Sequence, residues 1–122
     1  MEKKIILPHD HGEKEKITEI MESMPGDEVV SVVASALGKL SDPSRLRIFW
    51  LLCHCEECVI NIAAFMDMSS PAVSHHLSIL RSAGLIVSRR SGKETYYRAA
   101  DTELVQTLHH MIEKIGKISC PE

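Results

Sequence analysis

The sequence predicts a mainly α-helical α+β fold in which a helix-turn-helix is followed by a two-stranded β wing. Three observations indicate this fold. A capped helix with one polar face runs from Ser70 to Gly84, and the residues after it alternate in polarity and turn back near Gly92. Positive charge is also concentrated here: residues 69–98 hold five Lys or Arg side chains and one Glu, a local charge of +4 in a chain of net charge −3.

The helix at residues 70–83 has one face suited to a DNA groove. Ser70 is expected to cap its first free amide group, Pro71 loses no hydrogen bond there, and Gly84 supplies the left-handed stop. A basic hairpin alone also fits an ordinary solvated surface, but the polar helix directly before it favours a polyanionic partner. The predicted DNA-binding residues are Ser70, Ser74, His75, Ser78, Arg81, Arg89, Arg90 and Lys93.

The other helices are expected from apolar periodicity and from residues that cap helix ends. Their predicted positions are residues 13–24, residues 27–40, a core helix starting at Asp42-Pro43, a short helix at residues 59–68, and a last helix capped by Asp101. The short helix and the polar helix after it are joined by a three- or four-residue turn, which is the helix-turn-helix pattern.

The length of 122 residues suits a single domain. Residues 1–12 show no helical period and are expected to form a mobile arm, with residues 13–122 forming one winged helix-turn-helix domain. The apolar stripe of residues 27–40 is wider than one small domain can cover, and the last helix carries a second apolar seam. We therefore expect a homodimer that pairs through helices at about 13–40 and 101–118.

The cysteines indicate the kind of chemistry to expect. The sequence contains neither a signal peptide nor an apolar run long enough to cross a membrane, so we expect a cytoplasmic protein. Three of its four cysteines, Cys53, Cys55 and Cys58, are crowded together, which makes a poor disulfide framework in a reducing compartment. Metal, metalloid or redox chemistry is therefore expected of them.

Three motifs in order resemble the ArsR/SmtB family of small winged helix-turn-helix repressors: LSDPSRLRI at residues 40–48, PAVSHHL at residues 71–77, and Tyr96-Tyr97. The resemblance runs from about Val29 to the C-terminus. It implies a homodimeric transcriptional repressor, not an enzyme, that binds an imperfect inverted repeat in DNA and is released by an inducer, usually a metal or metalloid ion. The family's recognition positions fall on the helix residues predicted above, and its wing falls on residues 89–93.

The resemblance also implies where an inducer binds. The family's thiolate site usually places a C-x-C pair where this chain has Cys58-Val59-Ile60, so the first cysteine matches and Ile60 does not. Cys53 and Cys55 lie just upstream and could replace the missing thiolate, with Cys55 and Cys58 the easier pair. Such a site would take a thiophilic ion, namely cadmium, lead, zinc or arsenic(III), with no organic cofactor. The predicted ligands are Cys53, Cys55, Cys58, His9 and His11.

Other family members carry a zinc site across the last helices. Aligned on Asp101, that pattern leaves lysines at two of the four ligand positions, and ammonium groups do not bind zinc. The residues that could improvise a weaker site there are Asp101, Glu103, His110 and Glu113.

Several alternatives remain open at this point. The switch could be a redox or persulfide one, through a disulfide among Cys53, Cys55 and Cys58. Cys53 could equally be a core residue, His9 and His11 a solvated arm, and Cys120 could have no role. A small cysteine enzyme is disfavoured, because His54 is adjacent to a thiol in sequence and neighbours on a helix point apart.

Overall fold

The computed structural model describes residues 6–119 and divides into two compact units, Met1–Ala34 and Ser35–Glu122. The first unit contains α1 (Lys14–Ser23) and the start of α2 (Asp27–Lys39). Within the described part of this unit, no side chain of α1 is buried. Large apolar side chains are exposed at Ile20, Met21, Met24, Val29, Val30, Val32 and Val33. Most of the apolar stripe predicted at residues 27–40 is therefore uncovered in one chain, although Ala36 and Leu40 are buried.

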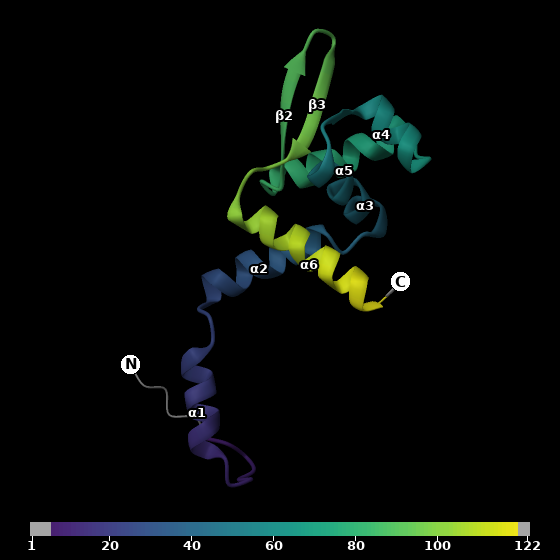
Figure 1. The fold of residues 1–122 in the computed structure, drawn as a ribbon. Coiled ribbons are helices and arrows are strands. Elements are labelled where there is room, and N and C mark those ends of the chain that lie inside the picture. Colours follow the sequence, from purple (N-terminus) through teal and green to yellow (C-terminus); the bar gives the residue numbers. More distant parts are fainter. Residues whose placement is uncertain (1–5, 120–122) are drawn as a thin grey trace. The chain divides into compact units, whose positions relative to one another are not determined.

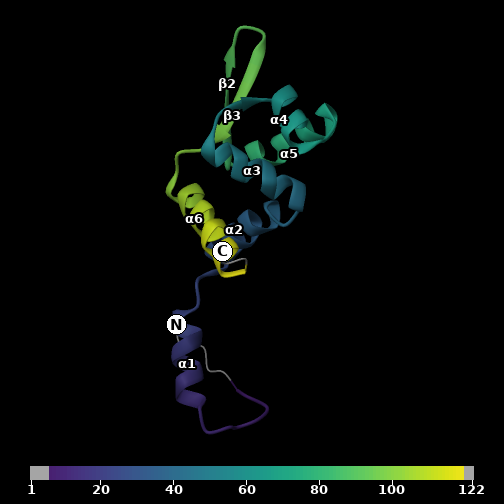
Figure 2. The same ribbon diagram turned by 45° about the vertical axis from the view of Figure 1, so that its right-hand side comes forward.

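The second unit is a winged helix-turn-helix, which confirms the predicted fold class (Figure 1). After the end of α2 its elements are α3 (Pro43–His54), β1 (Glu57–Cys58), α4 (Val59–Met66), α5 (Ser70–Ser82), β2 (Ile86–Ser91), β3 (Glu94–Ala99) and α6 (Glu103–Ser119). The helices α3, α4 and α5 pack on one another, and β2 and β3 project from them as a ribbon (Figure 2). No helix in residues 6–119 is long and apolar enough to cross a membrane.

One apolar core holds these helices in place. Its most completely buried side chains are Ile48, Phe49, Ile62, Val73, Leu77, Leu80, Leu85 and Ile86. They come from α3, α4, α5 and the start of β2, so the core joins the helix-turn-helix to the wing. Three of them, Val73, Leu77 and Leu80, lie on the inner face of α5. Because this face is buried in the core, the opposite face of the helix is exposed.

Of the predicted caps at helix N-termini, that of α3 is confirmed, and those of α5 and α6 are wrong by one residue. Asp42 caps α3 as predicted, since its carboxylate accepts a hydrogen bond from the Arg45 backbone N–H at 2.9 Å. In α5 the cap is Ser69 and not Ser70: Pro71 has no N–H to donate, and the Ser69 hydroxyl accepts from the Ala72 N–H at 3.2 Å.

The cap of α6 is likewise displaced by one residue. The Thr102 hydroxyl accepts from the Val105 N–H at 3.2 Å, whereas the Asp101 carboxylate accepts from the Gln106 side chain at 3.0 Å. Both shifts have the same cause: two cap-forming residues are adjacent in the sequence, and local spacing does not distinguish them.

The wing sheet contains a strand that the sequence did not predict. The strand order is β1-β3-β2, with Glu57 paired to Tyr97 and Cys58 paired to Tyr96. The cysteine-rich segment after α3 is therefore the third strand of the wing. The predicted turn is present between β2 and β3, with Gly92 at φ +63°, and Gly84 at φ +74° follows α5 as predicted.

Candidate DNA interface and candidate metal site

The polar face of α5 is exposed and borders a hollow. Ser74, His75, Ser78 and Arg81 are all exposed, as predicted, because the apolar face of the helix lies on the core. A polar hollow of about 490 Å³ opens beside this face and reaches β3; its lining residues are Ser74, Leu77, Ser78, Arg81, Ser82 and Tyr97. Hydroxyl and guanidinium groups around an open hollow are suited to hydrogen bonding with base edges and phosphates.

His76 lies on the other side of α5 and ties that helix to α3. Its side chain is only 14% exposed, its Nδ1 lies 3.3 Å from an Arg45 guanidinium nitrogen, and its Nε2 lies 3.8 Å from the Asp42 carboxylate. The hydrogen bond from the Arg45 N–H, with some help from the His76 ring, holds the pKa of Asp42 below its usual value. His76 therefore packs α5 onto α3, while its neighbour His75 faces solvent.

The basic residues of the wing are not equivalent. Within residues 6–119, Arg90 and Lys93 form no ion pair and are exposed, so they are free to meet phosphate. Arg89, in contrast, forms an ion pair with Glu56. This pair could not be predicted from the sequence, because the two residues are 33 positions apart.

We predict that Arg90→Ala and Ser74→Ala affect DNA binding in different ways. Loss of Arg90 removes one phosphate contact, so the slope of log K against log salt should fall in magnitude by about 0.9 on any sequence. Ser74→Ala should leave that slope unchanged and lower the preference for operator over random DNA by about fivefold. Fluorescence anisotropy at several salt concentrations measures both quantities. Unchanged binding by both variants would contradict the assignment of this interface.

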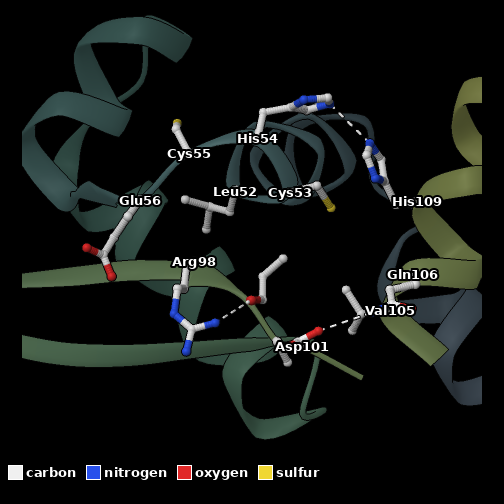
Figure 3. Close-up of a pocket in the computed structure, with 12 residues that line it drawn as sticks. Leu52, Cys53, His54, Cys55, Glu56, Arg98, Asp101, Val105, Gln106 and His109 are labelled. Carbon is white, nitrogen blue, oxygen red and sulfur yellow. Dashed lines mark hydrogen bonds between the residues drawn. The ribbon is translucent and has the colours of Figure 1, made fainter. Parts of the chain in front are cut away.

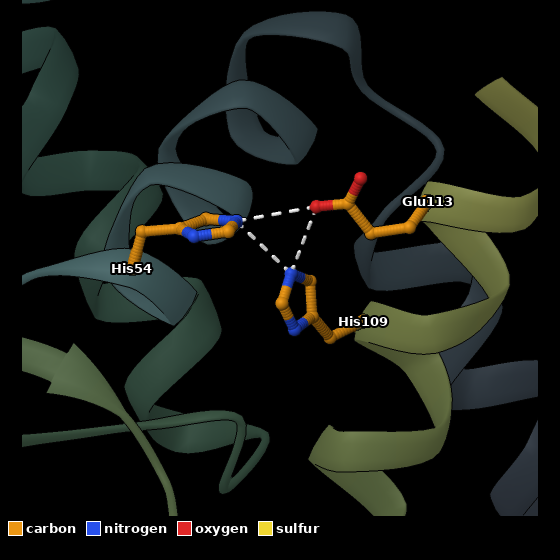
Figure 4. Close-up of side chains that lie close together, drawn as sticks. All are labelled: His54, His109 and Glu113. Atoms are coloured by element: carbon orange, nitrogen blue, oxygen red, sulfur yellow. Dashed lines mark hydrogen bonds and ion pairs between the residues drawn. The ribbon is translucent and has the colours of Figure 1, made fainter. Parts of the chain in front are cut away.

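A second group of polar side chains converges between α3 and α6 (Figure 4). His54 is the last residue of α3, and His109 and Glu113 lie four residues apart on one face of α6. The Oε1 atom of Glu113 lies 3.2 Å from His54 Nε2 and 3.2 Å from His109 Nε2, and the two ring nitrogens are 3.0 Å apart. Three potential metal-ligand atoms thus meet at one point.

These distances fit a metal ion. If each ligand atom lies about 2.1 Å from the ion, two ligand atoms are about 3.0 Å apart when the angle between them at the ion is a right angle. In a tetrahedral site the two ligand atoms are about 3.4 Å apart. The observed separations of 3.0 to 3.2 Å lie between these limits. All three side chains are partly exposed, at 43% for His54, 28% for His109 and 39% for Glu113. An ion could therefore enter without unfolding, and three ligands leave positions open for water.

Glu113 is held in the charged form. A hydrogen bond from the Trp50 indole N–H at 3.0 Å is the main cause that lowers the pKa of this carboxyl, and the His109 and His54 contacts lower it further. The carboxylate is therefore ionised at neutral pH. A cation at this point would meet a negative ligand already in place.

The predicted cysteine ligands differ in their exposure to solvent. Cys55 is exposed, Cys53 is half-buried and Cys58 is buried in β1. Cys58 is covered because the unpredicted strand pairing places it beside Tyr96. Within the described residues, no group of three close ligand atoms includes a cysteine. His9 and His11 belong to the first unit, with ring centroids 6.0 Å apart, and Cys120 lies outside the described residues.

Cys53 and Cys55 line one cavity with two of the metal-ligand candidates. The cavity has a volume of about 340 Å³, and Cys53, His54, Cys55 and His109 are among its lining residues (Figure 3). Burial raises the pKa of Cys53 to about 11, with a contribution from the Glu113 carboxylate, and burial also raises the pKa of Cys55. Both are protonated at neutral pH, and a metal ion would have to displace a proton from either sulfur.

We predict that iodoacetamide modifies Cys53 slowly at pH 7. The rate should rise roughly tenfold per pH unit between pH 8 and pH 10, because the thiolate is the nucleophile and its fraction grows by that factor below the pKa. Cys55 is more exposed and should react before Cys53 at every pH. Peptide mass spectrometry follows each residue separately. A rate for Cys53 that levels off below pH 8 would show that its pKa is lowered, not raised.

The weaker set predicted on the last helix does not assemble as expected. Glu113 contacts His109, one turn earlier, and His54; His110 belongs to no such group among the described residues. Asp101 and Glu103 are exposed, and Asp101 is engaged with Gln106. The His109–Glu113 spacing is visible in the sequence as a pair four apart, whereas the contribution of His54 requires the tertiary fold.

Comparison with known proteins agrees with this architecture. Residues 42–88 match the family model described as bacterial regulatory protein, arsR family. A transcriptional repressor SmtB homolog of Synechocystis is 34% identical over 101 residues, covering 83% of this chain and 76% of that protein. The transcriptional regulator NmtR of Mycobacterium tuberculosis is 40% identical over 80 residues, covering 66% of this chain and 67% of that protein.

A solved structure extends the agreement to three dimensions. The homodimeric winged helix-turn-helix DNA-binding domain of a possible ArsR-family regulator from Mycobacterium bovis matches with a TM-score of 0.66 and 31% identity, covering 78% of this chain and 90% of that domain. Sequence and fold thus agree over most of the chain. The chain belongs to the ArsR/SmtB family of DNA-binding winged helix-turn-helix transcriptional repressors, which are not enzymes.

Proposed function

We propose that this repressor is released from its operator by a divalent metal ion that binds His54, His109 and Glu113 between α3 and α6. The observation that carries the proposal is the meeting of three ligand atoms, 3.0 to 3.2 Å apart, from two different helices. Two imidazoles and one carboxylate suit borderline ions such as zinc, cobalt or nickel. Zinc also belongs to the thiophilic set expected from the sequence.

The position of this site supports a route to the DNA interface. His54 ends α3, and the recognition helix α5 packs on α3 through the buried core. An ion would join the end of α3 to α6. Two recognition helices on a two-fold axis must enter major grooves about 34 Å apart, so a small change in their placement weakens operator binding. A coupling of about 1 to 3 kcal/mol is typical and corresponds to a roughly 5- to 150-fold loss of affinity.

The active species in this proposal is a homodimer on an imperfect inverted repeat. The exposed apolar side chains of α6, Leu104, Ile115 and Ile118, support pairing of two chains, as does the homodimeric state of the Mycobacterium bovis domain. Burying such side chains in a symmetric interface would remove apolar surface from water and fix the spacing of the two recognition helices.

A thiolate site for cadmium, lead or arsenic(III) is the competing proposal for the inducer. It would use Cys53 and Cys55, which line one cavity, with Cys58 as a further ligand. A redox or persulfide switch through the same thiols is a second candidate function, and the exposed thiol of Cys55 favours it. The raised pKa values of Cys53 and Cys55 argue against a fast reaction with oxidants at neutral pH.

A titration of the reduced protein on labelled DNA from its own promoter tests the proposal. Anisotropy is followed with zinc, cobalt, nickel, cadmium, lead, arsenite and an oxidant in turn. Release by zinc, cobalt or nickel that persists in a Cys53→Ser/Cys55→Ser variant is the expected result. Release by cadmium, lead or arsenite alone, lost in that variant, would assign the thiolate site, and release by oxidant alone would assign the redox switch.

A further inference from the structure

The Arg89 side chain is held against Glu56 by a fork of hydrogen bonds. Arg89 Nε donates to both carboxylate oxygens of Glu56 at 2.9 Å, and Arg89 Nη2 donates to Oε1 at 2.5 Å. Glu56 is 26% exposed and Arg89 is 55% exposed, so the pair is open to solvent on one side. The hydrogen bonds lower the pKa of Glu56 and raise that of Arg89, which keeps both groups charged.

The wing sheet explains why this arginine reaches that carboxylate. Cys58, Tyr96 and Arg89 are direct cross-strand partners on β1, β3 and β2, so their side chains share one face of the sheet. The Arg89 guanidinium lies over the Tyr96 ring, 5.0 Å from its centre. Glu56 immediately precedes β1 and so lies just beyond that ring. Arg90, which follows Arg89 on β2, makes no ion pair among the described residues.

A guanidinium binds a carboxylate and a phosphate with the same fork of donors, so the two groups compete for it. We propose that Glu56 is an affinity-determining residue that occupies the phosphate-binding group of Arg89 while the protein is off DNA. DNA phosphate displaces Glu56 when the wing docks. Within residues 6–119, the predicted DNA-binding cations of the wing thus include two that form no ion pair, Arg90 and Lys93, and one, Arg89, that becomes available only by exchange of its partner. This inference does not depend on the metal site.

The consequence is a change in DNA affinity of limited size. An exposed ion pair contributes little because water and salt screen it, so its removal should tighten binding by about 1.5- to 5-fold at low salt. The gain should apply to DNA of any sequence, since a phosphate contact carries no base information. The gain in DNA affinity on removal of the Glu56 carboxylate should disappear when Arg89 is also replaced, because Glu56 then has no phosphate-binding group to occupy.

A double-mutant cycle on the full chain tests the proposal. Glu56→Gln, Arg89→Gln and the double variant are titrated against a labelled duplex of random sequence, with thermal unfolding as a check of the fold. Glu94→Gln is the matched control, because it removes one negative charge from the start of β3, and Glu94 forms no ion pair within residues 6–119.

The expected result is tighter binding by Glu56→Gln in the presence of Arg89 and no effect of the same change in the Arg89→Gln background. The control should have the same effect in both backgrounds. Weaker binding by Glu56→Gln would overturn the proposal, because Glu56 would then orient Arg89 toward DNA. An equal gain with and without Arg89 would also overturn it, because Glu56 would then act only through its overall charge.

Discussion

His109→Ala is expected to weaken zinc binding by more than about 100-fold. Loss of a residue that only supports a metal ligand costs 10- to 100-fold, and loss of a ligand should cost more. Trp50, the single tryptophan of the chain, donates its indole N–H to Glu113 Oε1, the oxygen that an ion would take. Zinc binding should therefore change the tryptophan fluorescence, and a titration with a competing chelator gives the affinity.

His110→Ala is the matched control. His110 is adjacent to His109 on α6, is exposed, and belongs to no cluster of ligand atoms in the described chain. Its replacement should change zinc affinity less than about threefold, since it removes an imidazole from the same helix without touching the site. A loss of zinc affinity for His110→Ala alone would return the site to the His110 set expected from the sequence, and no loss for either variant would remove both histidines from zinc binding.

Phe49→Ala is expected to destabilise the fold by about 3 to 5 kcal/mol. Phe49 has no exposed surface and lies in the core that joins α3 to the recognition helix, so truncation leaves a cavity in addition to losing apolar burial. Urea denaturation followed by circular dichroism, at a fixed protein concentration because a dimer's stability depends on it, gives the change in free energy.

The only other phenylalanine supplies the control for this experiment. Phe65 lies on α4 and is 61% exposed. Phe65→Ala removes the same atoms from a surface position and should change the free energy of unfolding by less than about 1 kcal/mol. Similar losses at both positions would mean that Phe65 is also covered in the folded protein, as it would be if a second chain or a ligand packed on α4.

Features encoded by local chemistry could be predicted from the sequence. Asp42 before Pro43, Gly84 after α5 and Gly92 in the wing turn each act through the backbone of their own segment. The apolar spacing of Val73, Leu77, Ile79 and Leu80 predicted which face of α5 would be buried, and all of these except the half-buried Ile79 are buried. The exposed residues proposed to bind DNA follow from that, because they are the remainder of the helix surface.

Features that depend on distant segments could not be predicted. A two-residue strand such as Glu57–Cys58 has no periodicity to detect, and its pairing with β3 both buries Cys58 and places Glu56 beside Arg89. His54 and Glu113 are 59 positions apart and meet only when α6 packs against the end of α3. The sequence therefore directed attention to the three cysteines, which lie within six residues of one another, while the assembled ligand atoms include His54, which is more than 50 positions from His109 and Glu113.

In the proposed mechanism, an ion bound by His54, His109 and Glu113 and an operator bound by α5 and the wing oppose each other's binding. Linkage requires the two effects to be equal, so the most direct test is the zinc affinity of the protein measured with and without saturating operator DNA. Operator DNA should weaken zinc binding by the same factor, roughly 5 to 150, by which zinc weakens operator binding. The same zinc affinity on and off the operator would contradict it.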